Sequence, residues 1–252
     1  MTVIKTKGII IKRINLGEAD KIITIITQNR GKIRVVAKSV RKPRARLGGF
    51  LEMFHYNEYL LAEGRNLDII TGASTLDTLR GISRGLKPIA LAYYVAEIID
   101  KLIEETQDPG NIFDLIYSTF REISKGNIKL SAIKSFFEIN MLNILGFKPE
   151  LDKCVECGQP IVSNGHFSFN LGGLLDDKHR LKDVATISIS NKEINILRQL
   201  LIVDIGDLDV DVVMVDLNDD SKLTQICSGF LNHIIGKRIQ SKEFWQKMVN
   251  FS

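Results

Sequence analysis

Two cysteines and a later aspartate–histidine pair have the spacing of metal ligands. Cys154 and Cys157 are separated by two residues, and Asp176 and His179 by the same interval. The third and last cysteine, Cys227, is too distant to complete a second Cys-x-x-Cys pair. Zinc accepts carboxylate oxygen and imidazole nitrogen as well as thiolate, so the two pairs can supply four tetrahedral ligands. We expect a structural rather than catalytic site, because four protein ligands leave no open position.

Two alternatives to this ligand set remain at the level of sequence. His166 is the main rival for the fourth position, and Asp177 is a lesser one. A further alternative is that the chain has lost its metal site and that the remaining thiols bind no metal. A carboxylate and an imidazole in place of two thiolates should bind zinc more weakly than four thiolates, because zinc favours softer ligands.

A second group of residues suited to chemistry is a run of cations. The segment AKSVRKPRARLGGF, residues 37–50, places five basic side chains close together: Lys38, Arg41, Lys42, Arg44 and Arg46. Pro43 and the pair Gly48-Gly49 are unsuited to a regular strand, so the segment is expected to be a loop. The arginine fork binds phosphate bidentately and stacks on bases. The loop is therefore a candidate nucleic-acid contact, with an ordinary solvated surface as the alternative.

The charge of the chain is concentrated at one end. Residues 1–80 carry 15 Lys and Arg against 7 Asp and Glu, whereas residues 81–252 carry 19 against 23. Such segregation indicates a polyanion partner for the N-terminal part. Four aromatic residues follow the basic run and could stack on bases, although we expect at least one set in the core: Phe50, Phe54, Tyr56 and Tyr59.

The elements that must position these residues differ between the two parts. Residues 3–80 contain five short segments rich in Ile, Val, Thr and Tyr, with a hairpin signal at QNRGK, and so predict a small closed barrel. An oligonucleotide-binding (OB) barrel is the first candidate and an SH3-like barrel the alternative. The fold class is thus α+β multidomain: an OB-fold domain at 1–80, then a helical domain at 81–252 with a zinc-knuckle-like insertion at about 150–182.

Helix signals place five helices after residue 80. The first has Pro88 in its first turn and runs through IALAYYVAEIIDKLIEE. The next follows Asp108-Pro109-Gly110, and a third runs from near Ser131 to Gly146. Ser190 and Glu193 have capping-box spacing. Residues 221–239 predict one more long helix.

Several function classes lack support in the sequence. The longest apolar run is too short to cross a bilayer, lysines interrupt any secretory signal, and three cysteines suggest a reducing cytoplasm. No phosphate-loop motif occurs. The acidic segment at 206–219 resembles a calcium loop but has Val212 where glycine is needed and Asn218 where glutamate is needed.

In combination, several stretches resemble the bacterial RecO family of recombination mediators over nearly the whole chain. They are KGIIIKRINLGEADKIITIIT, GKIRVVAKSVRKPRARLGGFLEMFHYNEYLL, LNILGFKPELDKCVECG, SFNLGGLL and HIIGKRIQSKEFW. The resemblance implies an OB barrel and a helical domain with a zinc knuckle. It also implies binding of single- and double-stranded DNA, strand annealing, and work with RecR to help RecA displace single-strand-binding protein, without catalysis, in the nucleoid-associated cytoplasm.

The resemblance assigns DNA binding to Arg34 on the strand leading into the loop, and to the five loop cations. The family's metal pattern is commonly Cys-x-x-Cys followed by Gly-Gly-x-x-Cys-x-x-Cys, and here Asp176 and His179 replace the second cysteines. Two other functions remain open. One is a metal-dependent nucleic-acid enzyme that uses Asp176, Asp177 and His179, and the other is an RNA-binding barrel protein of translation.

Overall fold

The computed structural model describes residues 3–105, 111–207, 217, 221–236 and 238–250. The chain forms two compact units, the first made of Met1–Ser124 with Ile239–Ser252 and the second of Lys125–Arg238. The predicted boundary at residue 80 marks the change from strands to helices, and its use as a domain boundary stays a prediction.

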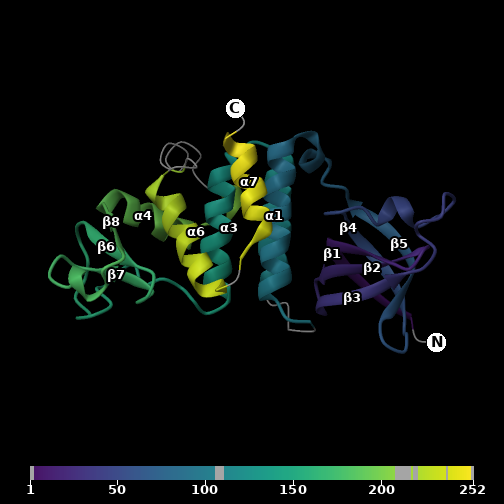
Figure 1. The fold of residues 1–252 in the computed structure, drawn as a ribbon, viewed down its shortest axis with the longest axis horizontal. Coiled ribbons are helices and arrows are strands. Elements are labelled where there is room, and N and C mark those ends of the chain that lie inside the picture. Colours follow the sequence, from purple (N-terminus) through teal and green to yellow (C-terminus); the bar gives the residue numbers. More distant parts are fainter. Residues whose placement is uncertain (1–2, 106–110, 208–216, 218–220, 237, 251–252) are drawn as a thin grey trace. The chain divides into compact units, whose positions relative to one another are not determined.

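The N-terminal strands form the barrel that the sequence predicts (Figure 1). They are β1 (Val3–Leu16), β2 (Asp20–Thr27), β3 (Gly31–Ala37), β4 (Tyr56–Ala62) and β5 (Asp68–Asp77). The barrel closes in the order β1-β2-β3-β5-β4, with β4 antiparallel to β1 and β5 parallel to β3. This Greek-key closure is that of an OB barrel, so the first candidate is confirmed.

Alternation along the strands supplies the barrel core. Ile23 and Ile25 on β2, and Val35 on β3, point inward and are fully buried. They pack with Tyr59 and Leu61 of β4. Successive side chains of a strand point to opposite faces, so residues two apart share the barrel interior. The pairing of Thr27 with Gly31 confirms the predicted β2–β3 hairpin.

The part of the first unit that the structure describes also has three α-helices: α1 (Leu86–Leu102), α2 (Ile112–Lys125, whose last residue falls in the second unit) and α7 (Gln240–Asn250). Pro88 lies in the first turn of α1, as predicted. Helix α7 packs against α1, although the whole second unit lies between them in the sequence. No signal in the sequence analysis predicted α7 as a separate helix.

In its described residues, the second unit contains three α-helices and a small sheet. The helices are α3 (Leu130–Ile144), α4 (Asn191–Leu200) and α6 (Lys222–Ile235), and the strands are β6 (Gly165–Ser168), β7 (Gly173–Leu175) and β8 (Thr186–Ile189). The sheet has the order β7-β6-β8. The capping box of Ser190 and Glu193 at the start of α4 is confirmed.

The predicted long helix over 221–239 is present as α6, but the predicted position of its C-terminal end was wrong. Helix α6 ends at Ile235, because Gly236 adopts the left-handed conformation with φ +60° and its N–H caps the carbonyl of Asn232. Asp108-Pro109-Gly110 and most of the calcium-like segment at 206–219 lie outside the described residues. Among the described helices, none combines the length and apolar character needed to cross a membrane.

Candidate nucleic-acid surface and metal centre

The basic loop occupies residues 38–55, the connection between β3 and β4. Its first half is anchored to the β1–β2 turn. The backbone N–H of Ser39 donates to Asp20 Oδ1 at 2.7 Å, and that of Arg41 donates to the carbonyl of Ala19 at 3.0 Å. The Arg41 guanidinium donates to the carbonyl of Gly17 at 2.7 Å. The loop is therefore held against the barrel at its first turn.

Successive tight turns order the remainder of the loop. Backbone hydrogen bonds join Lys42 to Ser39 and Ala45 to Lys42, at 3.3 and 3.0 Å. Val40 and Leu47 pack against the barrel core from this loop. Because the apolar residues face inward, the predicted cations face solvent, and all five are exposed: Lys38, Arg41, Lys42, Arg44 and Arg46.

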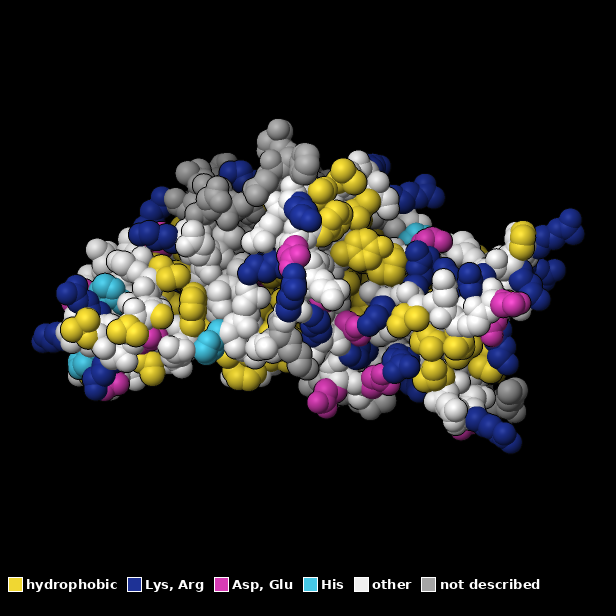
Figure 2. Space-filling model, viewed as in Figure 1, with side chains coloured by type: hydrophobic (Ala, Val, Ile, Leu, Met, Phe, Trp, Pro, Cys, Tyr) yellow, Lys and Arg dark blue, Asp and Glu magenta, His cyan; other side chains and the backbone are white. Residues whose placement is uncertain are grey.

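Four of these cations are uncommitted within the described part of the chain. Lys38, Lys42, Arg44 and Arg46 make no side-chain hydrogen bond or ion pair with another described residue. Figure 2 shows lysine and arginine side chains projecting from the barrel. A concentration of unpaired positive charge on an ordered loop is suited to a polyanion.

Arg34 differs from the loop cations. Its guanidinium lies 3.3 Å from Glu105 Oε1, and both side chains are about half exposed, at 45% and 47%. An exposed ion pair of this kind contributes little to stability, so phosphate can compete for the arginine. Arg34 is nevertheless less available than the loop cations.

The aromatic residues that follow the cations along the chain serve mainly in packing. Tyr59 lies in the barrel core, and burial raises its pKa. Phe54 is buried beside Phe120, while Tyr56 contacts Tyr117 with ring centroids 4.9 Å apart. Phe50 is the member of the predicted set that is exposed, at 36%.

The predicted metal ligands come from two turns of the second unit. Cys154 begins a tight turn in which its N–H donates to the carbonyl of Gln159 and its carbonyl accepts from Gly158, both at 2.8 Å. Asp176 follows β7 directly. Its Oδ1 accepts from the backbone N–H of His179 at 2.9 Å. Each turn therefore fixes its own pair of side chains.

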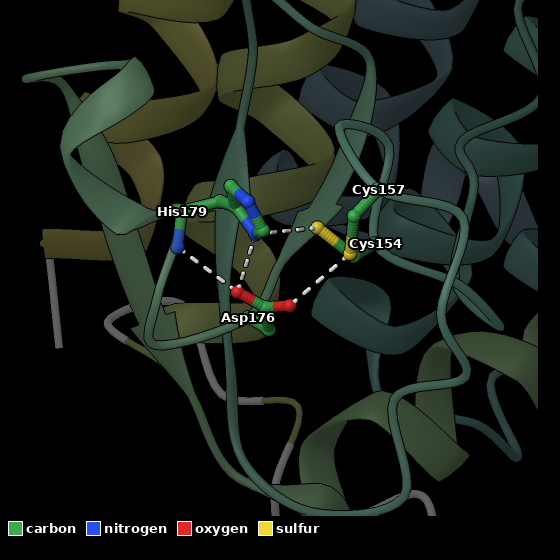
Figure 3. A group of neighbouring side chains, drawn as sticks. All are labelled: Cys154, Cys157, Asp176 and His179. Carbon is green, nitrogen blue, oxygen red and sulfur yellow. Dashed lines mark hydrogen bonds and ion pairs between the residues drawn. The ribbon is translucent and has the colours of Figure 1, made fainter.

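Figure 3 shows the four side chains pointing toward one another. Their ligand atoms all lie within 4.8 Å of each other. Cys154 Sγ is 3.9 Å from His179 Nδ1, and Cys157 Sγ is 3.4 Å from Asp176 Oδ2. Ligand atoms on one tetrahedral zinc are about 3.3–3.8 Å apart. The donor set and its spacing thus fit zinc without rearrangement of the fold.

Hydrogen bonds favour the charged forms of two ligands. Burial opposes ionisation of Cys154, but backbone N–H groups of Asp176, Cys157 and Glu156 outweigh it and lower the thiol pKa. Burial likewise opposes ionisation of Asp176, and donors from His179 and Cys157 lower its pKa to about 2. Thiolate and carboxylate are the forms that coordinate metal.

The two rival ligands lie outside this group. His166 Nε2 and Asp177 Oδ1 are 2.8 Å apart and form a pair of their own. Asp177 is 83% exposed. The structure therefore groups the four residues chosen first, while ligation itself stays a prediction.

Gly173 explains part of the Gly-Gly motif. A Cβ on Gly173 would lie 2.6 Å from the carbonyl oxygen of Glu150 and 2.8 Å from Val155 Cγ1. Since Cys154 lies between these two neighbours in sequence, the absence of a side chain lets β7 approach the thiol turn closely.

Two supporting residues were missed in the sequence. Asp20 accepts a hydrogen bond from the basic loop. It is one of only two acidic residues among the first fifty, and that rarity could have marked it in the sequence. Lys182 pairs with Glu156 at 2.7 Å and links the two ligand turns. Nothing in the local sequence marks that pair.

Comparison with known proteins agrees with this architecture. The family model described as "Recombination protein O N terminal" matches residues 1–79, and "Recombination protein O C terminal" matches residues 85–243. This chain belongs to the recombination protein O family. The RecO resemblance noted in the sequence is thereby confirmed.

Individual RecO relatives match most of the chain. The DNA repair protein RecO of Dehalococcoides mccartyi strain 195 is 34% identical over 197 residues, covering 78% of this chain and 77% of the relative. That of Bacillus pumilus is 29% identical over 247 residues, covering 97% and 94%. That of Roseiflexus sp. is 37% identical over 174 residues, covering 69% and 61%.

Proposed function

We propose that this chain is a DNA-binding recombination mediator of DNA repair. It binds single- and double-stranded DNA, anneals complementary strands and, with RecR, assists RecA in replacing single-strand-binding protein. It acts in the cytoplasm, at the nucleoid. The observation that carries the proposal is the ordered basic loop, with four uncommitted cations, on an OB barrel. Family membership supports the repair context.

The mechanism is electrostatic. The five cations of the basic loop neutralise phosphates and release counterions from the bound strand. They are Lys38, Arg41, Lys42, Arg44 and Arg46. Neutralisation lowers the repulsion between two backbones, so complementary strands approach and pair. No bond is made or broken in this scheme.

Zinc, when bound by Cys154, Cys157, Asp176 and His179, supplies a cross-link between the two turns of the second unit. Four protein ligands fill a tetrahedral shell, which favours a scaffold over the alternative of a metal-dependent enzyme. Asp177, which that enzyme would require, pairs instead with His166.

A salt titration tests the proposal. If about five phosphates are contacted, the logarithm of affinity falls with the logarithm of salt concentration at a slope near −3.5 for single strands and about −4.5 for duplex. The measurement is fluorescence anisotropy with labelled oligonucleotides in rising salt. A flat response contradicts the phosphate grip.

The same samples separate the alternatives. Incubation with magnesium or manganese should leave strands intact while annealing proceeds, whereas the enzyme alternative predicts cleavage that Asp176→Ala abolishes. Competition between RNA and DNA of equal length addresses the RNA-binding alternative, which a strong preference for RNA would support.

A further inference from the structure

A pocket of about 300 Å³ lies in the first unit, between the end of the basic loop, the residues that follow β5, and α1. Met53, Phe54, Ile82, Ile89 and Tyr93 supply apolar surface. Polar groups come from β1, from the end of the basic loop and from the residues after β5, and include Arg13, His55, Arg80 and Ser83. The volume is at the lower end of the range for small-ligand pockets, so it suits one flat group.

Tyr93 gives the pocket an exposed aromatic surface. Its side chain is 42% exposed, whereas its neighbour Tyr94 is fully buried. Phe54 holds the Tyr93 ring edge-on, with centroids 5.2 Å apart and planes at 74°. Figure 2 shows hydrophobic side chains gathered over part of α1, with basic side chains beside them. A ring held at its edge keeps a face for another flat group.

Phe54 is itself fixed in an unusual way. Its φ is +68°, a conformation uncommon for a bulky residue. Its N–H donates to the carbonyl of Ile10 at 2.9 Å, and its ring packs on Phe120 at 5.3 Å. Strained backbone of this kind persists where the surroundings over-determine it, and it is concentrated at binding sites.

The polar wall provides a cation for phosphate. Arg13 is already paired with Glu52 at 2.8 Å. Arg80 is exposed and makes no ion pair with a described residue. Hydrogen bonds hold the backbone on either side of it, from Leu79 N–H to Asp77 Oδ1 at 2.9 Å and from Gly81 N–H to Ser124 Oγ at 3.0 Å.

His55 adds unused hydrogen-bonding capacity. Its Nδ1 is buried without a hydrogen-bond partner among the described residues. Burial lowers the pKa of His55 and so favours the neutral ring. A neutral imidazole offers both a donor and an acceptor, as does the edge of a nucleobase.

From these contacts we infer that the pocket binds one unpaired nucleobase of a single DNA strand, stacked on Tyr93, with the adjoining phosphate at Arg80. This inference rests on the proposed DNA-binding function. Residues 38–55 connect the two sites, because the loop that begins with the cations ends at Met53, Phe54 and His55 on the pocket wall. A strand gripped by the loop would present its bases to this pocket only when they are unpaired.

Substitution of Tyr93 tests the stacking. Tyr93→Ala should weaken binding of a short oligo-dT about 5- to 150-fold, which is the ~1–3 kcal/mol of one stacked base at 1.4 kcal/mol per tenfold. Affinity for an abasic oligomer or a blunt duplex of equal length should not change. Tyr93→Phe should retain affinity because it keeps the ring. Leu86→Ala, at a residue of α1 that is 66% exposed and outside the pocket lining, is the matched control.

Substitution of Arg80 tests the phosphate contact. Arg80→Ala should weaken oligo-dT and the abasic oligomer alike and reduce the magnitude of the salt slope by about 0.7. Tyr93→Trp adds a second tryptophan to the chain, in addition to the buried Trp245. Oligo-dT should quench the emission of the introduced tryptophan, and the abasic oligomer should not.

Three outcomes overturn the inference. They are unchanged oligo-dT affinity in Tyr93→Ala, an equal loss for the abasic oligomer, and quenching of the Trp reporter by an acidic apolar peptide but not by oligo-dT. If strand binding persists in these cases, the proposed function stands and the pocket assignment fails. If the unmodified protein binds no oligonucleotide, both fail.

Discussion

At the residue scale, the four candidate ligands show how a site can be found from spacing even when half of the usual ligands are replaced. The interval of two residues within each pair was enough to identify the four candidates. Each tight turn projects both members of its pair toward one point. Sequence could not choose between His179 and His166. The choice depends on β6, which directs His166 to Asp177 instead.

Metal content tests this site. Purified protein should contain about one zinc per chain, because the four donors complete one tetrahedral shell. The Cys154→Ser variant should lose most of this zinc, because backbone N–H groups favour ionisation of the buried Cys154 thiol. Elemental analysis measures the loss. Cys227→Ala is the control, because Cys227 is fully buried outside the ligand group.

The same Cys154→Ser variant also tests whether the metal site takes part in nucleic-acid binding. Oligonucleotide affinity of Cys154→Ser should stay within about twofold of the unmodified protein, because its substitution leaves the basic loop intact. Equal zinc in both cysteine variants would contradict the ligand assignment.

At the element scale, α7 depends on a carboxylate from another helix. Glu97 of α1 accepts from the N–H of Gln240 at 3.0 Å and from the N–H of Ser241 at 2.7 Å. These are first-turn amides of α7, which would otherwise lack partners. Burial opposes ionisation of Glu97, but the donors Lys101, Ser241 and Gln240 prevail and lower its pKa to about 2.

Glu97→Gln should therefore loosen α7. We expect a loss of about 1–2 kcal/mol in the free energy of unfolding at pH 7, as for removal of a helix cap. Because the folded pKa of about 2 lies below the ordinary 4.5, the stabilisation is present above pH 4.5 and disappears as pH falls toward 2. The difference in free energy of unfolding between Glu97→Gln and the unmodified protein should therefore shrink as the pH falls from 4.5 toward 2.

Trp245 reports the change, because it is the single tryptophan, lies on α7 and is 4% exposed. Its emission should shift to the red in Glu97→Gln at lower denaturant than in the unmodified protein. Glu63→Gln, in an exposed loop residue of the barrel, is the control. A pH-independent difference would show that the carboxylate charge is not what holds α7.

The elements also show where sequence-based prediction stopped. The β-branched composition of the five strands, the β2–β3 hairpin and the Ser190 cap are local signals, and each was confirmed. The division of residues 221–239 at Gly236 was missed, because an apolar pattern continues across a glycine whose φ is set by the fold. The packing of α7 on α1 was also missed, since it joins segments far apart in the chain.

At the scale of the whole molecule, the charge segregation read from composition takes a definite form. Many cations of the barrel are engaged, as in Lys5 with Glu58 and Arg30 with Asp68. The loop cations form no ion pair with a described residue, so position rather than net charge distinguishes them. Composition could indicate a polyanion partner but could not separate these two groups, because ion pairing depends on the folded neighbours.

If the cations of the basic loop hold the DNA backbone, reversing their charge should weaken DNA binding more than reversing cations elsewhere. One variant reverses Arg41, Lys42, Arg44 and Arg46 to Glu. Its matched control reverses four exposed cations elsewhere in the first unit: Lys7, Arg65, Arg121 and Lys247. Both variants have the same net charge, so non-specific repulsion acts on both.

The measurement is the rate of annealing of complementary strands, with oligonucleotide affinity measured beside it. We expect at least a hundredfold loss of affinity and loss of annealing in the loop variant, since about four phosphate contacts become repulsive. The control variant should lose far less. Equal behaviour of the two variants, or undiminished annealing by the loop variant, would contradict the account.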